Sequence, residues 1–121
     1  MKNKYNLEIP NELILRYISL IINKIYKLLP LYEGMSKITK KIVVPVDIAY
    51  KNYINELELL RIEVSGDYYI YENNEIFLKL LALLEGMQEI KINQHKIVRA
   101  SVFKCISLCD SLKEDIREDD L

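Results

Sequence analysis

The sequence contains few of the residues on which most catalytic and metal-binding sites depend. Its 121 residues include one histidine, two cysteines, three glycines and no tryptophan. The glycines are isolated at positions 34, 66 and 86, so they cannot form a glycine-rich phosphate-binding loop. No paired-cysteine zinc motif is present, and a single histidine excludes a multi-histidine metal site within one chain. We therefore predict no metal ion, no cofactor and no catalytic residues, and we expect that the protein is not an enzyme.

The single imidazole still needs an interpretation. His95 stands close to Lys96 and Arg99 near the predicted start of a helix. In one hypothesis His95 is a general base, and Arg99 binds a phosphate with help from the helix N-terminus. We favour the simpler hypothesis, which is a solvated histidine among polar neighbours.

The two cysteines, Cys105 and Cys109, are four residues apart within a predicted helix. That spacing separates Cβ atoms on one helix face by about 5–6 Å. A disulfide usually needs Cβ atoms closer than about 4.5 Å, which disfavours a bond between these two residues. Both fall on the apolar seam of the helix, so we expect free thiols packed in the core of a protein from a reducing compartment.

Long uncharged apolar runs and a strong net charge are also missing. No uncharged apolar stretch reaches the roughly 18 residues of a membrane-spanning helix, and no targeting segment is recognisable. We therefore predict a cytoplasmic protein without a membrane span. The formal net charge is −1, with +3 in residues 1–60 and −4 in residues 61–121, which argues against coating of nucleic acid by bulk charge. A chain rich in Lys, Ile, Asn and Tyr is typical of an AT-rich bacterial, phage or archaeal genome.

Hydrophobic residues make up 50% of the chain, and their spacing predicts helices. Four segments have the alternating four- and three-residue spacing of an apolar helix seam: 10–29, 45–60, about 75–87 and about 94–114. Pro30 is expected to end the first helix. Asn73 or Asn74 can cap the third helix, and Asn93 can cap the last. Short connections predict that neighbouring helices run antiparallel.

The segment 61–71 has a different character. Ile62 and Val64 alternate with charged residues, and a Ser-Gly-Asp turn sequence follows at positions 65–67. The tyrosine-rich residues after this turn favour a strand. We therefore predict a small β-hairpin here.

The predicted fold is mainly α. It is a four-helix bundle-like single domain over residues 1–121, with the small β-hairpin inserted between the second and third helices. Residues 1–9 and the acidic residues 115–121 are expected to fray.

The apolar content is high for so small a domain, and a contiguous exposed apolar patch usually marks an interface. Tyr68, Tyr69 and Tyr71 would point to both faces of the hairpin, so at least one would be exposed, as is typical of protein interfaces. We recognise no family motif in these residues. The hypothesis that remains is a non-enzymatic protein–protein interaction module that forms a homo-oligomer or binds a partner protein. A small accessory, regulatory or inhibitor protein of a bacterial or phage system would fit this description.

A nucleic-acid-binding small subunit is the alternative hypothesis. The densest basic cluster of the sequence lies before the second predicted helix, and further cations follow near the start of the last helix. This hypothesis predicts phosphate contacts and a steep loss of binding with salt. The residues that would contact phosphate are Lys37, Lys40, Lys41, Lys51, Lys96 and Arg99.

Overall fold

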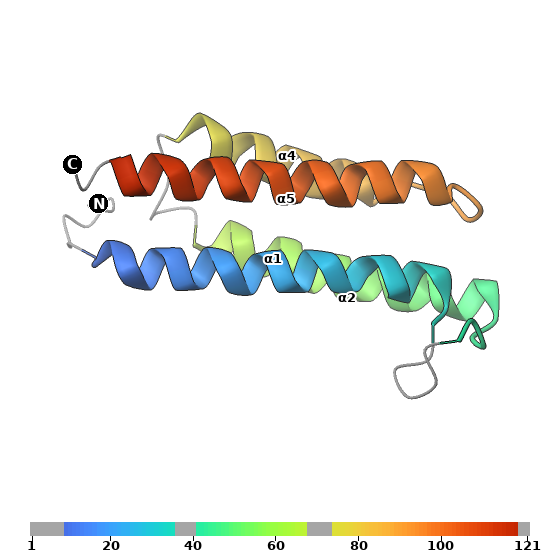
Figure 1. Cartoon of the computed structure of the whole chain (residues 1–121). Coiled ribbons are helices and arrows are strands. Elements are labelled where there is room, and N and C mark those ends of the chain that lie inside the picture. The colour runs from blue at the N-terminus through green and yellow to red at the C-terminus, as the bar shows by residue number, and fades with distance from the viewer. Residues whose placement is uncertain (1–8, 36–40, 68–73, 119–121) are drawn as a thin grey trace.

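The computed structural model describes residues 9–35, 41–67 and 74–118, which form four α-helices (Figure 1). These helices are α1 (Asn11–Glu33), α2 (Val46–Gly66), α4 (Glu75–Met87) and α5 (His95–Glu118). The mainly α, four-helix arrangement predicted from the apolar spacing is therefore confirmed. Among these helices, none combines the length and the apolar character that a membrane-spanning segment needs.

The four helices form a bundle in which each helix packs against two neighbours. α1 lies between α2 and α5, and α4 lies between α5 and α2. Figure 1 shows two layers, with α1 and α2 in one and α4 and α5 in the other. Neighbours are antiparallel, as the Asn11 side chain near the start of α1 illustrates: it donates to the carbonyl of Ile116 near the end of α5 at 3.2 Å.

The core is built from the seams that the spacing predicted. In α1 the buried residues recur every four and three positions, and α5 continues the same pattern on its inner face. The buried seam of α1 consists of Ile14, Ile18, Ile21, Ile25, Leu28 and Tyr32. The buried seam of α5 consists of Val98, Val102, Cys105, Ile106, Cys109, Leu112 and Ile116.

The predicted end of the first helix is wrong by one turn. Pro30 lies inside α1, which continues to Glu33. Proline removes one backbone donor, but Tyr32 beyond it is only 6% exposed and anchors the extra turn in the core. The helix ends at Gly34, whose φ of 78° is the left-handed conformation that glycine adopts most easily.

The predicted β-hairpin is also corrected. α2 runs to Gly66 rather than ending at residue 60, so the expected first strand and the first two residues of the expected turn are helical. The reason is burial: Val64 extends the seam of Leu57 and Leu60 and is 1% exposed. The expected second strand, residues 68–71, lies outside the described residues. Within the part that the structure describes, the one β feature is an isolated bridge between Met35 and Ile42.

The remaining helix ends agree with the sequence in part. Asn74 caps α4 as expected, because its side-chain oxygen accepts a hydrogen bond from the Phe77 amide at 3.0 Å. Before α5, the carbonyl of Gln94 accepts the first helical bonds, whereas the expected cap, Asn93, precedes it at a φ of 67°. α5 also extends to Glu118, so residues 115–118, which were expected to fray, are helical.

Candidate protein interface

A set of large apolar side chains remains exposed on the described part of the bundle. Some are near helix ends or in connections, but several lie in the middle of α1 and α2, off the buried seams. Leu59 is 61% exposed, Leu20 is 58% exposed and Ile62 is 54% exposed. Exposed apolar residues are ordinary when scattered, so their importance depends on whether they share one surface. The others are Leu13, Tyr26, Met35, Ile42, Val43, Val46, Ile48, Leu78, Ile92, Ile97 and Phe103.

A groove between α1 and α2 includes one residue of this set, Leu59. Its volume is about 280 Å³, and its apolar lining comes from two leucines of each helix: Leu28, Leu31, Leu59 and Leu60. Leu28 and Leu60 also belong to the core, so the groove is open down to the packed interior. We call this feature the α1–α2 groove.

The walls of the α1–α2 groove carry opposite charges. Lys24 and Lys27 stand on the α1 side, and Glu56 and Glu63 stand on the α2 side. Lys24 bridges the groove: its Nζ atom lies 2.7 Å and 2.9 Å from the two carboxylate oxygens of Glu63. Both side chains of this pair are more than a third exposed, so the ion pair adds little stability and is screened by salt.

The opposite side of α1 also exposes aromatic surface. Tyr26 of α1 and Phe103 of α5 form an edge-to-face pair with ring centroids 6.2 Å apart. Each ring is 46% exposed. This pair is a second, smaller apolar feature, separate from the α1–α2 groove because it lies between α1 and α5.

The sequence-predicted interface residues cannot be compared with these surfaces. Tyr68, Tyr69 and Tyr71 lie outside the described residues, as do Lys37 and Lys40. The sequence contained only a weak indication of the α1–α2 groove. Leu59 and Leu20 are apolar residues that fall off the seams of their helices, and such residues look like extra core until the packing is known.

The other predicted phosphate-contacting residues lie near one end of the bundle, where α1 ends and α2 and α5 begin. Lys41, Lys51 and Lys96 are exposed there. Arg99 is engaged at the same end, because its Nη2 atom lies 3.2 Å from a carboxylate oxygen of Glu33. The described cations therefore share one end of the bundle, although an acidic neighbour offsets one of them.

His95, the only imidazole, packs beside an aromatic cluster at that end. Its ring meets the ring of Tyr32 edge to face, with centroids 5.1 Å apart. Tyr32 also contacts Tyr53 and Tyr50, with centroids 4.9 Å and 6.3 Å away. The Tyr32 hydroxyl donates to the carbonyl of Lys91 and accepts from the amide of Gln94. These bonds hold the connection between α4 and α5, so the cluster has a clear structural role.

The two cysteines are free and buried, as predicted. Burial raises the pKa of both thiols to about 12; the proximity of Cys109 adds to this for Cys105, and that of Asp110 adds to it for Cys109. The Sγ atom of Cys105 lies 3.7 Å from the sulfur of Met87 in the core. Thiols with such high pKa values are poor nucleophiles at neutral pH.

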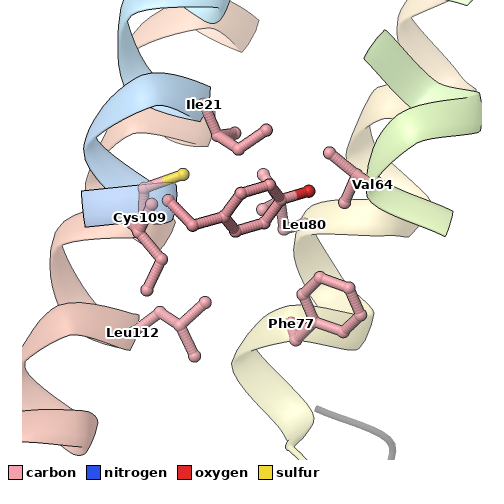
Figure 2. Close-up of a pocket in the computed structure, with 8 residues that line it drawn as sticks. Ile21, Val64, Phe77, Leu80, Cys109 and Leu112 are labelled. Carbon is pink, nitrogen blue, oxygen red and sulfur yellow. The ribbon is translucent and has the colours of Figure 1, made fainter. Parts of the chain in front are cut away.

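A small apolar cavity lies inside the bundle, between α1, α2, α4 and α5 (Figure 2). Phe77 and Leu80 enter it from α4, and Cys109 and Leu112 enter it from α5. The space inside is about 10 Å³, which is at or below the roughly 10–15 Å³ that one water needs. The cavity is thus a packing defect of the core rather than a ligand pocket.

Among the described residues, no cluster of three or more His, Cys, Asp or Glu side chains has the proximity to hold a metal ion. Comparison of the chain with protein-family models, with curated proteins and with solved structures finds no match. Any assignment of function must therefore be argued from the surfaces of this bundle.

Proposed function

We propose that this protein is a non-enzymatic protein–protein interaction module that forms a homo-oligomer or binds a partner protein. The observation that carries the proposal is the α1–α2 groove, where the half-buried Leu31 and the exposed Leu59 present apolar surface between two charged walls. Leu20 and Ile62 are exposed apolar residues of the same two helices, outside the lining of the groove. Lys27 follows Leu20 by seven residues, which places both on one side of α1. Ile62 follows Leu59 by three residues, which makes them neighbours on α2.

The energetic reason is the exposed apolar area. Each square ångström of apolar surface removed from water is worth about 25 cal/mol, so burying several leucine-sized side chains favours association. The charged walls of the groove supply orientation, because complementary charges select a partner and a register more than they add affinity. This combination of an apolar centre and a polar rim is the usual anatomy of a protein interface.

We also propose a biological context for this module from its sequence. A cytoplasmic accessory, regulatory or inhibitor protein of a bacterial or phage system fits the small size, the lysine- and isoleucine-rich composition and the buried free thiols.

The test is size-exclusion chromatography with light scattering on the full chain, with the ratio of absorbance at 260 and 280 nm recorded across the peak. We expect a mass that is a multiple of the 14.3 kDa chain, or that matches a complex with a captured and identified protein, and a protein-like absorbance ratio. A monomer at all concentrations that retains no specific protein from its native host would contradict the proposal.

A nucleic-acid-binding subunit is the second candidate, supported by the position of its cations. Lys41, Lys51, Lys96 and Arg99 lie at one end of the bundle, so a single strand or duplex could contact them together. In this case the chromatographic peak would absorb strongly at 260 nm and would lose the nucleic acid as salt is raised. Lys51→Glu would weaken that binding about uniformly across nucleic-acid sequences, whereas Lys79→Glu on α4 would leave it unchanged.

A further inference from the structure

We propose that the α1–α2 groove binds a second copy of this chain, and that the two copies align in parallel about a two-fold axis along the helices. This inference rests on the proposed interaction function and names its partner and surface. The occupant is argued from charge: one wall of the groove is cationic and the other is anionic, so the groove is complementary to itself.

The direction of the two-fold axis follows from which wall carries which charge. An axis parallel to the helices, lying in the interface, places α1 of one copy opposite α2 of the other. Lys24 and Lys27 of each copy then face the glutamate wall of its partner. An axis perpendicular to the helices would instead set lysines against lysines and glutamates against glutamates, which is unfavourable.

The heights of the charges along the bundle agree with the parallel arrangement. The ion pair between Lys24 and Glu63 shows that these two residues lie at the same level. Because α1 and α2 are antiparallel, Lys27 lies one turn further along, toward the level of Glu56. A rotation about an axis parallel to the helices preserves these levels. Lys24 of one copy therefore meets the level of Glu63 in the other, and Lys27 falls between the two glutamates.

The leucines fill the centre of the proposed interface. Leu59 is 61% exposed at the edge of the groove, while Leu28 and Leu60 form its floor. In the parallel pair, Leu59 of each copy packs beside α1 of the other, close to Leu31. The acidic second half of α5 lies in the other layer of the bundle (Figure 1), so repulsion between those segments acts across more than one helix diameter and is strongly screened.

The first experiment measures the mass of the full chain by sedimentation over a concentration series at low salt. We expect a monomer–dimer equilibrium with an upper limit of twice 14.3 kDa. Leu59→Glu is expected to raise the dissociation constant at least about tenfold, because it buries a charge among leucines. Leu78→Glu on α4 is the matched control, since Leu78 is 43% exposed away from the groove, and it should leave the equilibrium unchanged.

The second experiment tests the charged walls. Lys27→Glu changes the charge of the four groove residues from 0 to −2, and Glu56→Lys changes it from 0 to +2. Each variant alone should therefore dimerise at least about tenfold more weakly, because like charges then meet across the interface. Mixed together, the two variants should form a heterodimer, because an acidic groove then meets a basic one. Lys79→Glu on α4 is the control for the charge change, and circular dichroism establishes that every variant remains helical.

The outcomes separate this inference from the proposed function. Dimerisation that survives Leu59→Glu and both charge reversals would overturn the groove as the interface, while self-association itself would stand. A wild-type chain that stays monomeric would also overturn the inference, and the interaction function would then depend on a partner of another sequence. Weakened dimers of the single variants without a heterodimer in the mixture would overturn the parallel arrangement.

Discussion

The hydroxyl of Tyr53, in the first half of α2, donates a hydrogen bond to the carbonyl of Met87 at the end of α4 at 3.0 Å. Tyr53 is fully buried, and its burial, with Tyr32 and Tyr50 close by, raises the pKa of its hydroxyl above the usual range. This bond ties α2 to the shortest of the four described helices at the point where that helix stops.

Tyr53→Phe is expected to lower the free energy of unfolding by about 1 kcal/mol, because a buried hydrogen bond is lost while the ring remains. The cost stays modest because the Met87 carbonyl also accepts from the amide of Ile90 at 3.3 Å. Urea unfolding followed by circular dichroism measures the change. Tyr26→Phe, on an exposed ring, is the control and should change stability by less than about 0.5 kcal/mol. Equal effects of the two variants would show that the Tyr53 bond does not contribute.

Leu84→Ala is expected to destabilise the protein by about 2–5 kcal/mol, because Leu84 is 0% exposed in the core of α4 and its removal leaves a cavity. Leu78→Ala on the same helix provides the comparison, since Leu78 is 43% exposed. Thermal and urea unfolding of both variants give the two values. A loss for Leu78→Ala as large as that for Leu84→Ala would contradict the packing described for α4.

Two glycines are expected to respond in opposite directions to alanine. Gly34→Ala places a Cβ atom 2.8 Å from the carbonyl oxygen of Val44 at a φ of 78°, so it should destabilise by about 1–2 kcal/mol or more. Gly86→Ala adds a Cβ atom to α4 with no atom within 4 Å, and it should stabilise by about 0.5–1 kcal/mol. The difference in midpoint between the two variants in urea is the measurement. A Gly34→Ala variant as stable as the wild type or more stable would refute the left-handed end of α1, and a destabilised Gly86→Ala variant would contradict the open surroundings of Gly86.

Because both thiols are buried, we expect the protein to lose stability at alkaline pH. Their pKa is about 9 in the unfolded chain and about 12 in the folded protein, so the folded state holds protons that the unfolded state releases. The stabilisation is therefore complete below pH 9 and is lost as the pH rises toward 12. Each thiol should contribute a fall of about 1.4 kcal/mol per pH unit within that window.

The measurement is urea unfolding between pH 7 and about 10.5, compared with a variant that carries both Cys105→Ala and Cys109→Ala. The variant should lose less stability per pH unit above pH 9, with a remaining decline from Tyr53, whose pKa is also raised. Parallel pH profiles of the two proteins would show that the thiols are accessible to water in the folded state.

The spacing of the apolar residues predicted most of the fold, because it is a local property of the sequence. Residues such as Ile14, Ile18 and Ile21 can share one face only in a helix, and a face that is wholly apolar must be buried. The cap at Asn74 is local for the same reason, since its partner is the amide three residues away. The buried, free state of Cys105 and Cys109 follows from their place on the same kind of seam.

Local rules failed where distant contacts outweighed them. Pro30 ordinarily ends a helix, but Tyr32 reaches the connection between α4 and α5 and holds the next turn in place. The alternation of Ile62 and Val64 suited a strand, but Val64 fits the helical seam of α2, and burial in the common core decided the conformation.

The sequence by itself determined four apolar seams, their approximate limits and the small number of groups able to perform chemistry, because each depends on residue type and spacing. Only the tertiary structure decided which apolar residues stay outside the core. Leu28 and Leu59 are equally hydrophobic, yet one is 2% exposed and the other 61% exposed. The difference arises from the way α1 and α2 pack side by side, which buries Leu28 and brings the lysine wall, the glutamate wall and the exposed Leu59 to one groove.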